Sequence, residues 1–449
     1  MVYGPHTPES RAQMLAALGV ESVDALFDDI PAGVRAEGLE LPGPLSELEL
    51  SRELEALAAR NRVELTSFLG AGVYAHHIPA AVDAVLSRGE FYTAYTPYQP
   101  EISQGTLQTI YEFQSLIGEL TGLPVVSASH YDGAAATAEA ALMTVRATRR
   151  DRVLVSRAVH RHYLETTGTY FAPGARVIEE LPTLPDGTTD LAALESALAE
   201  AERPVAGVIL GQPNAFGSLE PMARAGELAH AAGALFVAVI EPTSLAVLAP
   251  PSDYGADIAA GEGQPLGIAP GYGGPYLGLL ACSRELIRQV PGRLVGKTTD
   301  VEGRRAFVMT LRAREQDIRR DKAASNICTN QALCALAATT YLATVGPHGL
   351  ADVAASGAAA ARRLESALAR IGIERVHSAP YLNEFAVRVP DAAAVHARLL
   401  GEGVLAGLPL ARWYPDDPEL AEALLLATTE LTTEADIERL VAALEEARS

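Results

Sequence analysis

Residues 235–244 read LFVAVIEPTS, a short apolar run that ends abruptly in polar residues. Six apolar residues without alternation are typical of a strand buried on both faces of a parallel sheet. Two similar runs, at residues 152–155 and 205–209, precede it, and helical patterns lie between these runs across residues 105–280. Strands that alternate with helices predict a doubly wound α/β layer.

Helical patterns flank this layer on its amino-terminal side. Apolar residues recur at helical spacing over residues 7–26 and again over residues 45–61, with a breaker cluster at Pro42, Gly43 and Pro44 between them. We therefore predict an amino-terminal helical arm over residues 1–65.

The layer and the segments after it complete the predicted architecture. An alanine-rich helix is expected from Asn330 through Leu342, followed by a strand at residues 384–389 and a helix at residues 434–447. We predict a large domain with a mixed, mostly parallel sheet over residues 66–330, and a connecting helix with a smaller carboxyl-terminal α+β domain over residues 331–449.

Composition restricts the classes of partner. The formal net charge is −21, so the surface repels phosphate backbones and anionic membranes, and we expect neither nucleic acid nor a membrane as partner. A leader-like amino terminus and an apolar run of about 18 residues are both missing, which predicts a soluble, unexported protein. The three cysteines, Cys282, Cys328 and Cys334, fit neither a disulfide framework nor a metal knuckle, so we expect a reducing cytoplasm.

The segment SASHYDGAAATAEAALM, residues 127–143, follows a predicted strand and opens a helix with small residues. Backbone N–H groups and the helix dipole at such a start favour a phosphate or another anion. A tight turn without a ligand is the alternative, because small residues also permit close helix packing.

Glu241 directly follows the strand predicted at Leu235–Ile240. Ligands of open α/β folds bind at the carboxyl ends of strands, and an acid there could pair with a pyridinium nitrogen. Capping of the strand end is the equally open alternative.

Residues 91–105, FYTAYTPYQPEISQG, carry Tyr92, Tyr95 and Tyr98 among stiffening prolines. Rigid tyrosines suit a ligand wall or an interface anchor, and loop packing is the plainer alternative. The pairs His76-His77 and His160/His162 are not accompanied by acids or cysteines at ligand spacing, so we expect structural or stacking roles for them and no metal.

Residues 314–330, REQDIRRDKAASNICTN, place basic residues before Ser325, Asn326 and Thr329. Cations followed by hydroxyl and amide donors can hold a phosphate. A solvated helical charge run is the plainer interpretation of residues 314–322, but it fits the hydroxyl-rich end poorly.

Four stretches together closely resemble the amino-terminal half of the glycine cleavage system P-protein. They are FLGAGVYAHHIPA at residues 68–80, FYTAYTPYQPEISQG, GEGQPLGIAPGYGGPYLG at residues 261–278, and REQDIRRDKAASNICTNQAL from residue 314. The resemblance covers about residues 5–445 in matching order. Where the P-protein is split, the chain is similar to subunit 1, the alpha chain of an α2β2 assembly.

The resemblance implies the architecture of fold type I enzymes, the aspartate aminotransferase-like group that depends on pyridoxal phosphate (PLP). In the family, the Schiff-base lysine lies in the other half, before a glycine-rich GGP. Alignment on Gly273-Gly274-Pro275 places Gln264 at the lysine position, and an amide cannot form a Schiff base. The implied pocket of this chain is therefore degenerate, with Ser129, Gly133, Ala134, His160, Glu241 and Gln264 at its positions.

The resemblance also implies the reaction and the partners. A lysine-bearing beta subunit binds PLP covalently and decarboxylates glycine, and the aminomethyl group passes to the lipoyl arm of the H-protein. The activity is that of glycine dehydrogenase (aminomethyl-transferring). We expect this chain to complete the partner's active site with Tyr95, Tyr98, Ser325, Asn326 and Thr329, although Ala324 departs from the threonine common in relatives.

Two alternatives remain at this point. The chain has two lysines, Lys297 and Lys322, and a self-sufficient PLP enzyme would have to use one of them. Against this, Lys297 is expected in a turn beyond the strand end, and Lys322 in a basic helical run. The other alternative is a purely structural subunit that stabilises the beta chain and contacts no ligand.

Overall fold

The computed structural model describes residues 6–36, 38–271, 273–327 and 329–448, so Cys328 lies outside the described residues. The chain divides into two compact units, Met1–Val63 and Glu64–Ser449. The predicted boundary near residue 330 falls within the second unit and stays a prediction.

The first unit contains two helices, α1 (Pro8–Leu18) and α2 (Glu47–Ala58). Helix α1 ends at Leu18 rather than continuing to Leu26, because Gly19 takes a left-handed conformation with φ 71°. Ser46 and Glu49 form a capping box that begins α2. None of the described residues of this unit is buried, and most leucines of the two helices are exposed.

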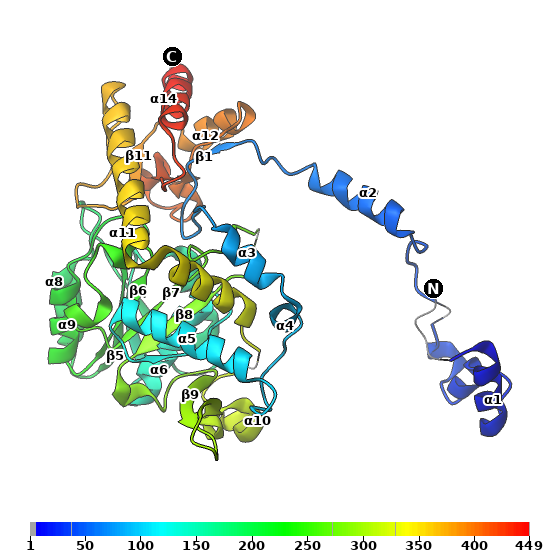
Figure 1. Ribbon diagram of the computed structural model, residues 1–449. Helices are drawn as coiled ribbons and strands as arrows, with labels where there is room; N and C mark the ends of the chain where they lie inside the picture. The colour runs from blue at the N-terminus through cyan, green and yellow to red at the C-terminus, as the bar shows by residue number, and fades with distance from the viewer. Residues whose placement is uncertain (1–5, 37, 272, 328, 449) are drawn as a thin grey trace. The chain divides into compact units, whose positions relative to one another are not determined.

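A seven-stranded mixed sheet forms the centre of the second unit (Figure 1), in the order β2-β8-β7-β6-β5-β3-β4. Strand β8 runs antiparallel to its neighbours β7 and β2, and the remaining neighbouring pairs are parallel. The strands are β2 (Val125–Val126), β3 (Arg152–Ser156), β4 (Val177–Leu181), β5 (Val205–Gln212), β6 (Leu235–Ile240), β7 (Ile258–Glu262) and β8 (Gly278–Cys282).

Helices cover both faces of this sheet, which confirms the doubly wound α/β prediction. Phe236, Ala238 and Ile240 of β6 join one core cluster, whereas Val237 and Val239 join another, because successive side chains of a strand point to opposite faces. The first cluster contains residues of α3 (Ala80–Leu86), α5 (Gln104–Thr121), α8 (Leu191–Leu198), α9 (Met222–Ala231) and α11 (Ala332–Arg370); the second contains residues of α6 (Gly133–Thr148) and α7 (Arg161–Phe171).

The segment before α11 differs from expectation at both lysines. Lys297 lies on β9 (Leu294–Thr299), opposite Phe307 of β10 (Arg305–Thr310), so the predicted turn is wrong. Threonine and valine around Lys297 favour a strand, and this preference prevails over the flanking Gly296 and Asp300. The predicted basic helical run is present but interrupted: α10 (Gln316–Arg319) ends before Arg320, which has φ 51°, and Lys322 lies in a separate 3₁₀ turn.

The carboxyl-terminal part has its own core. Helix α11 extends past Leu342 and kinks at Gly346, where φ is 64° and Pro347 follows. A three-stranded antiparallel sheet has the order β11-β14-β13, and its strands β11 and β14 bury a third apolar cluster together with the helices α11, α12 and α14. The elements of this part are β11 (Glu384–Arg388), α12 (Ala392–Gly401), β12 (Val404–Leu405), β13 (Leu408–Pro409), α13 (Pro418–Ala421), β14 (Ala423–Ala427) and α14 (Glu434–Arg448). Strand β1 (Thr66–Ser67) pairs with β12, and the short helix α4 (Gly89–Tyr92) follows α3.

Among the described residues, no helix is long and apolar enough to cross a membrane.

Candidate functional site

A cavity of about 60 Å³ lies at the carboxyl ends of β5, β6 and β7. We call it the strand-end pocket and define it by its polar and aromatic lining residues Tyr74, His160, Tyr163, Glu241, Glu262 and Glu384. A buried water needs about 10–15 Å³ of such space, so the cavity holds only a few waters. Of the residues predicted for a degenerate pocket, His160 and Glu241 line it.

Glu262, the last residue of β7, binds the amino terminus of α6. Its Oε2 accepts a hydrogen bond from the Gly133 N–H at 2.9 Å, and its Oε1 accepts from the N–H groups of Gln264 and Leu277, each at 2.9 Å. Burial raises the pKa of Glu262 to about 7, while these three N–H donors favour its ionised form. At the turn predicted to favour an anion, the backbone N–H group of Gly133 thus bonds to a carboxyl group of the chain itself.

Aromatic rings close the pocket beside this carboxylate. The His160 ring stacks on Tyr163 with centroids 4.6 Å apart and meets Trp413 edge-on at 4.5 Å. His160 Nδ1 accepts from the His162 N–H, so Nε2 carries the proton and donates to the Ala71 carbonyl at 2.8 Å. Burial lowers the pKa of His160 to about 4, which leaves the ring neutral, as the predicted stacking role requires.

Gln264 is fully buried, and its amide bonds to the backbone of two loops. Nε2 donates to the carbonyls of Tyr74 at 2.9 Å and Ile268 at 2.6 Å, and Oε1 accepts from the Tyr74 N–H at 2.9 Å. Its side chain thus joins the segment 68–80 to the loop after β7. Gln264 therefore has a structural role, and its amide offers no nucleophilic atom.

Glu241 caps the strand end, as in the second of its two sequence interpretations. Its oxygens accept from the N–H groups of Thr243 at 3.0 Å and Ser244 at 2.7 Å, and the Thr243 hydroxyl donates to Oε1 at 2.7 Å. Its carboxylate nevertheless lines the pocket.

Glu384, at the start of β11, is a third carboxyl group in the pocket. It accepts from the Tyr74 hydroxyl at 2.8 Å and the Ala71 N–H at 2.6 Å. Burial raises the pKa of Glu384 to about 7, and burial with the nearby carboxylates also raises the pKa of Tyr74. The pocket therefore contains three carboxyl groups, and burial favours the protonated forms of Glu262 and Glu384.

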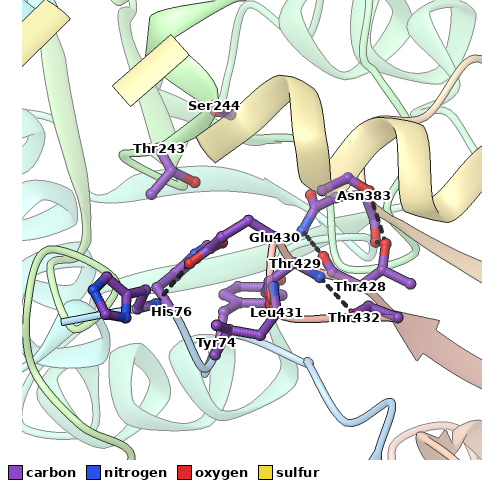
Figure 2. A network of polar contacts seen from close by, with 12 residues as sticks. Tyr74, His76, Thr243, Ser244, Asn383, Thr428, Thr429, Glu430, Leu431 and Thr432 are labelled. Carbon is purple, nitrogen blue, oxygen red and sulfur yellow. Dashed lines mark hydrogen bonds and ion pairs between the residues drawn. The ribbon is translucent and has the colours of Figure 1, made fainter. Parts of the chain in front are cut away.

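A network of polar contacts connects the segment 68–80 to Glu430, near the start of α14 (Figure 2). His76 Nδ1 lies 2.7 Å from Glu430 Oε2, and the His77 N–H donates to Glu430 Oε1 at 2.6 Å. Asn383 Nδ2 donates to the Thr428 carbonyl at 3.1 Å in the same network. Within the described ranges, no group of three or more His, Cys, Asp or Glu side chains could hold a metal.

A second, open region lies around the predicted tyrosines. We call it the tyrosine surface and define it by Tyr92, Tyr95, Tyr98 and Thr329. Tyr92 and Tyr95 are 70% and 74% exposed. Tyr95 and Thr329 line one cavity of about 200 Å³ between residues 91–110 and the start of α11.

The other predicted residues of this surface differ in orientation. Tyr98 is 46% exposed and packs between the guanidinium groups of Arg293 and Arg312, 5.7 and 5.5 Å from its ring centre. Asn326 is exposed, whereas the Ser325 hydroxyl donates to the buried Glu139 of α6. The structure thus brings Tyr95 and Thr329 together and turns Ser325 toward its own chain.

The remaining predicted positions are structural in their contacts. The buried Ser129 hydroxyl accepts from the Gln331 N–H at 3.0 Å, just before α11, and Ala134 lies in the first turn of α6. Lys322 lines a cavity with Arg146 and Arg288, and Lys297 lines another with Arg305. Neither lysine lines the strand-end pocket.

Sequence reasoning missed Glu262, Tyr163 and Glu384. Glu262 stands in the quoted GEGQP stretch, where an acid between two glycines at a strand end was an available signal. Glu384 carries no such signal, because its environment comes from residues 71–74 far away in the sequence.

Comparisons with known proteins place this geometry in context. A family model described as "Glycine cleavage system P-protein" matches residues 1–444. A protein of Moorella thermoacetica named "Probable glycine dehydrogenase (decarboxylating) subunit 1" is 53% identical over 447 residues, with 99% of each chain covered. A protein of the same name from Carboxydothermus hydrogenoformans is 49% identical over 445 residues, with 98% of each covered.

Solved structures agree. A crystal structure titled glycine decarboxylase (P-protein) of the glycine cleavage system, in inhibitor-bound form, is similar with a TM-score of 0.92 and 45% identity, covering 99% of this chain and 100% of the other. A sphingosine-1-phosphate lyase of Burkholderia pseudomallei, 16% identical with a TM-score of 0.66, covers 93% of this chain and 94% of its own, and shows the fold alone. The fold is that of fold type I PLP enzymes, as predicted.

Proposed function

The chain belongs to the glycine cleavage system P-protein family, and from this membership we propose that it is the non-lysine subunit of a glycine decarboxylase. It assembles with a lysine-bearing subunit 2 as α2β2. The assembled enzyme decarboxylates glycine and transfers the aminomethyl group to the lipoyl arm of the H-protein. PLP supplies the electron sink for the decarboxylation.

The absence of an amine from the strand-end pocket is the observation that carries this proposal. Gln264 is an amide with three backbone partners, and Lys297 and Lys322 line other cavities. A covalent PLP enzyme needs a lysine at the cofactor. We therefore assign covalent PLP binding to the partner subunit, against the alternative of a self-sufficient enzyme.

The strand-end pocket does not fit PLP in other respects as well. Three carboxyl groups, from Glu241, Glu262 and Glu384, line a cavity of about 60 Å³. A phosphate there would meet carboxyl oxygens, which are mainly acceptors, and too little space, since small-molecule pockets usually measure about 300–1,000 Å³. No step of the reaction is assigned to this pocket.

The tyrosine surface is the part of this chain that we assign to the reaction. Tyr95 offers a rigid ring beside a cavity of about 200 Å³, and Thr329 offers a hydroxyl on the same cavity. The ring suits a wall that orients a small substrate and excludes water, and the hydroxyl suits a phosphate oxygen. We place Tyr95, Tyr98, Asn326 and Thr329 at the partner's cofactor, with Ser325 supporting the segment through Glu139.

The working environment follows from charge and from the family. A net charge of −21 opposes binding to nucleic acid and to anionic membranes, and we place the enzyme in the cytoplasm. Its partners are subunit 2, the lipoylated H-protein and glycine.

Reconstitution tests this function. Release of CO2 from carboxyl-labelled glycine, in the presence of lipoylated H-protein and PLP, is measured for this chain, for subunit 2 and for their mixture. The proposal predicts activity in the mixture and none with either chain alone. Full activity of subunit 2 alone, or activity of this chain alone, would exclude it.

A further inference from the structure

The amino terminus of α6 already has an internal ligand. Helix α6 spans 16 residues, so its dipole and its unpaired first N–H groups favour an anion. The carboxylate of the N-cap residue Asp132 accepts a hydrogen bond from the Ala135 N–H at 2.7 Å. The Gly133 N–H is left for a second acceptor, and Glu262 supplies it.

Three separate segments converge on this one carboxylate. Gly133 begins α6, Gln264 follows β7 and Leu277 precedes β8, and each donates a backbone N–H at 2.9 Å. Backbone N–H groups that converge in this way form a binding site for an anion in many phosphate-binding proteins. An ordinary helix cap uses a residue adjacent in sequence, whereas Glu262 lies far along the chain from Gly133.

The space around the carboxylate is also filled. A Cβ placed on Gly133 would lie 2.3 Å from the Tyr163 hydroxyl oxygen and 2.9 Å from the Glu262 nitrogen. Glu262 is 7% exposed, and His160 stacks on the ring face of Tyr163. An external phosphate could bind these N–H groups only after the Glu262 side chain had moved away.

We propose that Glu262 is a built-in substitute for the cofactor phosphate. Its carboxylate neutralises the helix terminus and satisfies the three N–H donors that a bound phosphate would otherwise satisfy. The subunit therefore folds with its cofactor position closed and has no need of PLP for its own stability. This inference rests on contacts within the chain and is independent of the role assigned to the tyrosine surface.

Chemical rescue tests the inference on the full-length chain. Glu262→Ala leaves the N–H groups without an acceptor and opens space for an anion. We expect a lower Tm in chloride, and recovery by about 3 °C or more when inorganic phosphate replaces chloride at equal ionic strength. The wild-type chain is expected to show no phosphate-specific shift, because Glu262 already holds the position.

Glu384→Ala is the matched control. It removes another buried carboxyl group from the same pocket, but one with a single backbone N–H donor and no place at a helix terminus. We expect a lower Tm without recovery in phosphate. Equal responses of the wild type and both variants to phosphate would mean a general salt effect and would overturn the inference.

If the variant fails to fold, its refolding yield can still test the inference. If Glu262→Ala does not fold in chloride, the yield of folded chain on dilution from denaturant is compared in phosphate and in chloride. A gain in yield in phosphate that exceeds the gain of Glu384→Ala supports the substitution of one anion for the other, and equal gains overturn it, because phosphate stabilises folded proteins in general. Glu262→Gln, which fills the space without charge, is expected to fold and to show no phosphate response.

Discussion

The strand-end pocket and the tyrosine surface use similar side chains in opposite environments. In the pocket, Tyr74 is 8% exposed and donates to Glu384, and Glu241 and Glu262 accept hydrogen bonds from neighbouring backbone. Gln264, which precedes the lining residue Pro265, also bonds to backbone. On the surface, Tyr92 and Tyr95 are 70% and 74% exposed beside an open cavity. A region whose polar groups are bonded internally has little capacity for a ligand, whereas exposed rigid tyrosines favour contact with another molecule.

The contrast assigns different consequences to mutation in the two regions. Changes in the strand-end pocket are expected to affect stability, and changes on the tyrosine surface are expected to affect activity of the assembled enzyme. A purely structural subunit would lack the second effect.

The largest effect is expected from Thr329→Val, with Tyr95→Ala as a companion. Loss of a hydrogen bond to a charged group costs about 1.5–3 kcal/mol, so glycine decarboxylation by the mixture should fall roughly 10- to 100-fold and PLP affinity should fall with it. The stability of the free subunit should stay within about 0.5 kcal/mol, because Thr329 is exposed.

Thr344→Val, an exposed threonine on α11, is the control and should retain full activity. Unchanged activity and PLP affinity in Thr329→Val, Tyr95→Ala and Asn326→Ala together would favour the structural-subunit alternative.

The next effect is on stability, at Gln264→Ala. The change leaves the Tyr74 N–H and two buried carbonyls without partners, so the free energy of unfolding should fall by about 3 kcal/mol. Denaturant unfolding of the isolated chain measures it, with Gln108→Ala, at a half-buried glutamine whose side-chain amide bonds to Glu112, as control. A loss below about 1 kcal/mol would show that the tie between the two loops is weak.

The pH dependence of the unfolding free energy tests the strand-end pocket through the titration of Glu384. Glu384 has a pKa of about 7 in the folded chain against an ordinary value of 4.5, so the folded state binds more protons between these values. Its contribution to stability is therefore present at acidic pH and is lost as pH rises through about 7, by up to about 1.4 kcal/mol per pH unit.

Glu384→Gln removes this titration while keeping the shape of the side chain. The unfolding free energy of the wild type should fall relative to that of Glu384→Gln as pH rises from 5 to 8. The titration of His160, whose pKa is lowered to about 4, changes the unfolding free energy of the wild type and of the variant equally, so it cancels in their difference. Parallel stability curves would contradict the assignment of a raised pKa to Glu384.

The smallest effect is expected at Tyr98→Leu in the isolated chain. The change removes the stacking of two guanidinium groups on a half-exposed ring, which is worth about 0.5–1 kcal/mol. Thermal unfolding of this variant and of Tyr92→Leu measures it. A loss equal at both positions would mean that the arginines contribute nothing specific.

The fold was more predictable from sequence than the pocket. The run at Leu235–Ile240 is a strand as predicted, because unbroken apolar residues require burial on both faces. Lys297 was misplaced, because glycine and aspartate beside a strand resemble a turn. The family resemblance located Gln264, but its three hydrogen bonds and the role of Glu262 depend on segments that meet only in the folded chain. The predicted contributions of Asn326 and Thr329 to a partner stay predictions.

Borohydride trapping tests the central claim most directly, that this chain does not hold the reactive cofactor. The chain alone and its mixture with subunit 2 are incubated with PLP, reduced and analysed by peptide mass spectrometry. The account predicts a reduced adduct on a lysine of subunit 2 and none on this chain. A stoichiometric adduct on Lys297 or Lys322 would contradict it and make this chain a PLP enzyme in its own right.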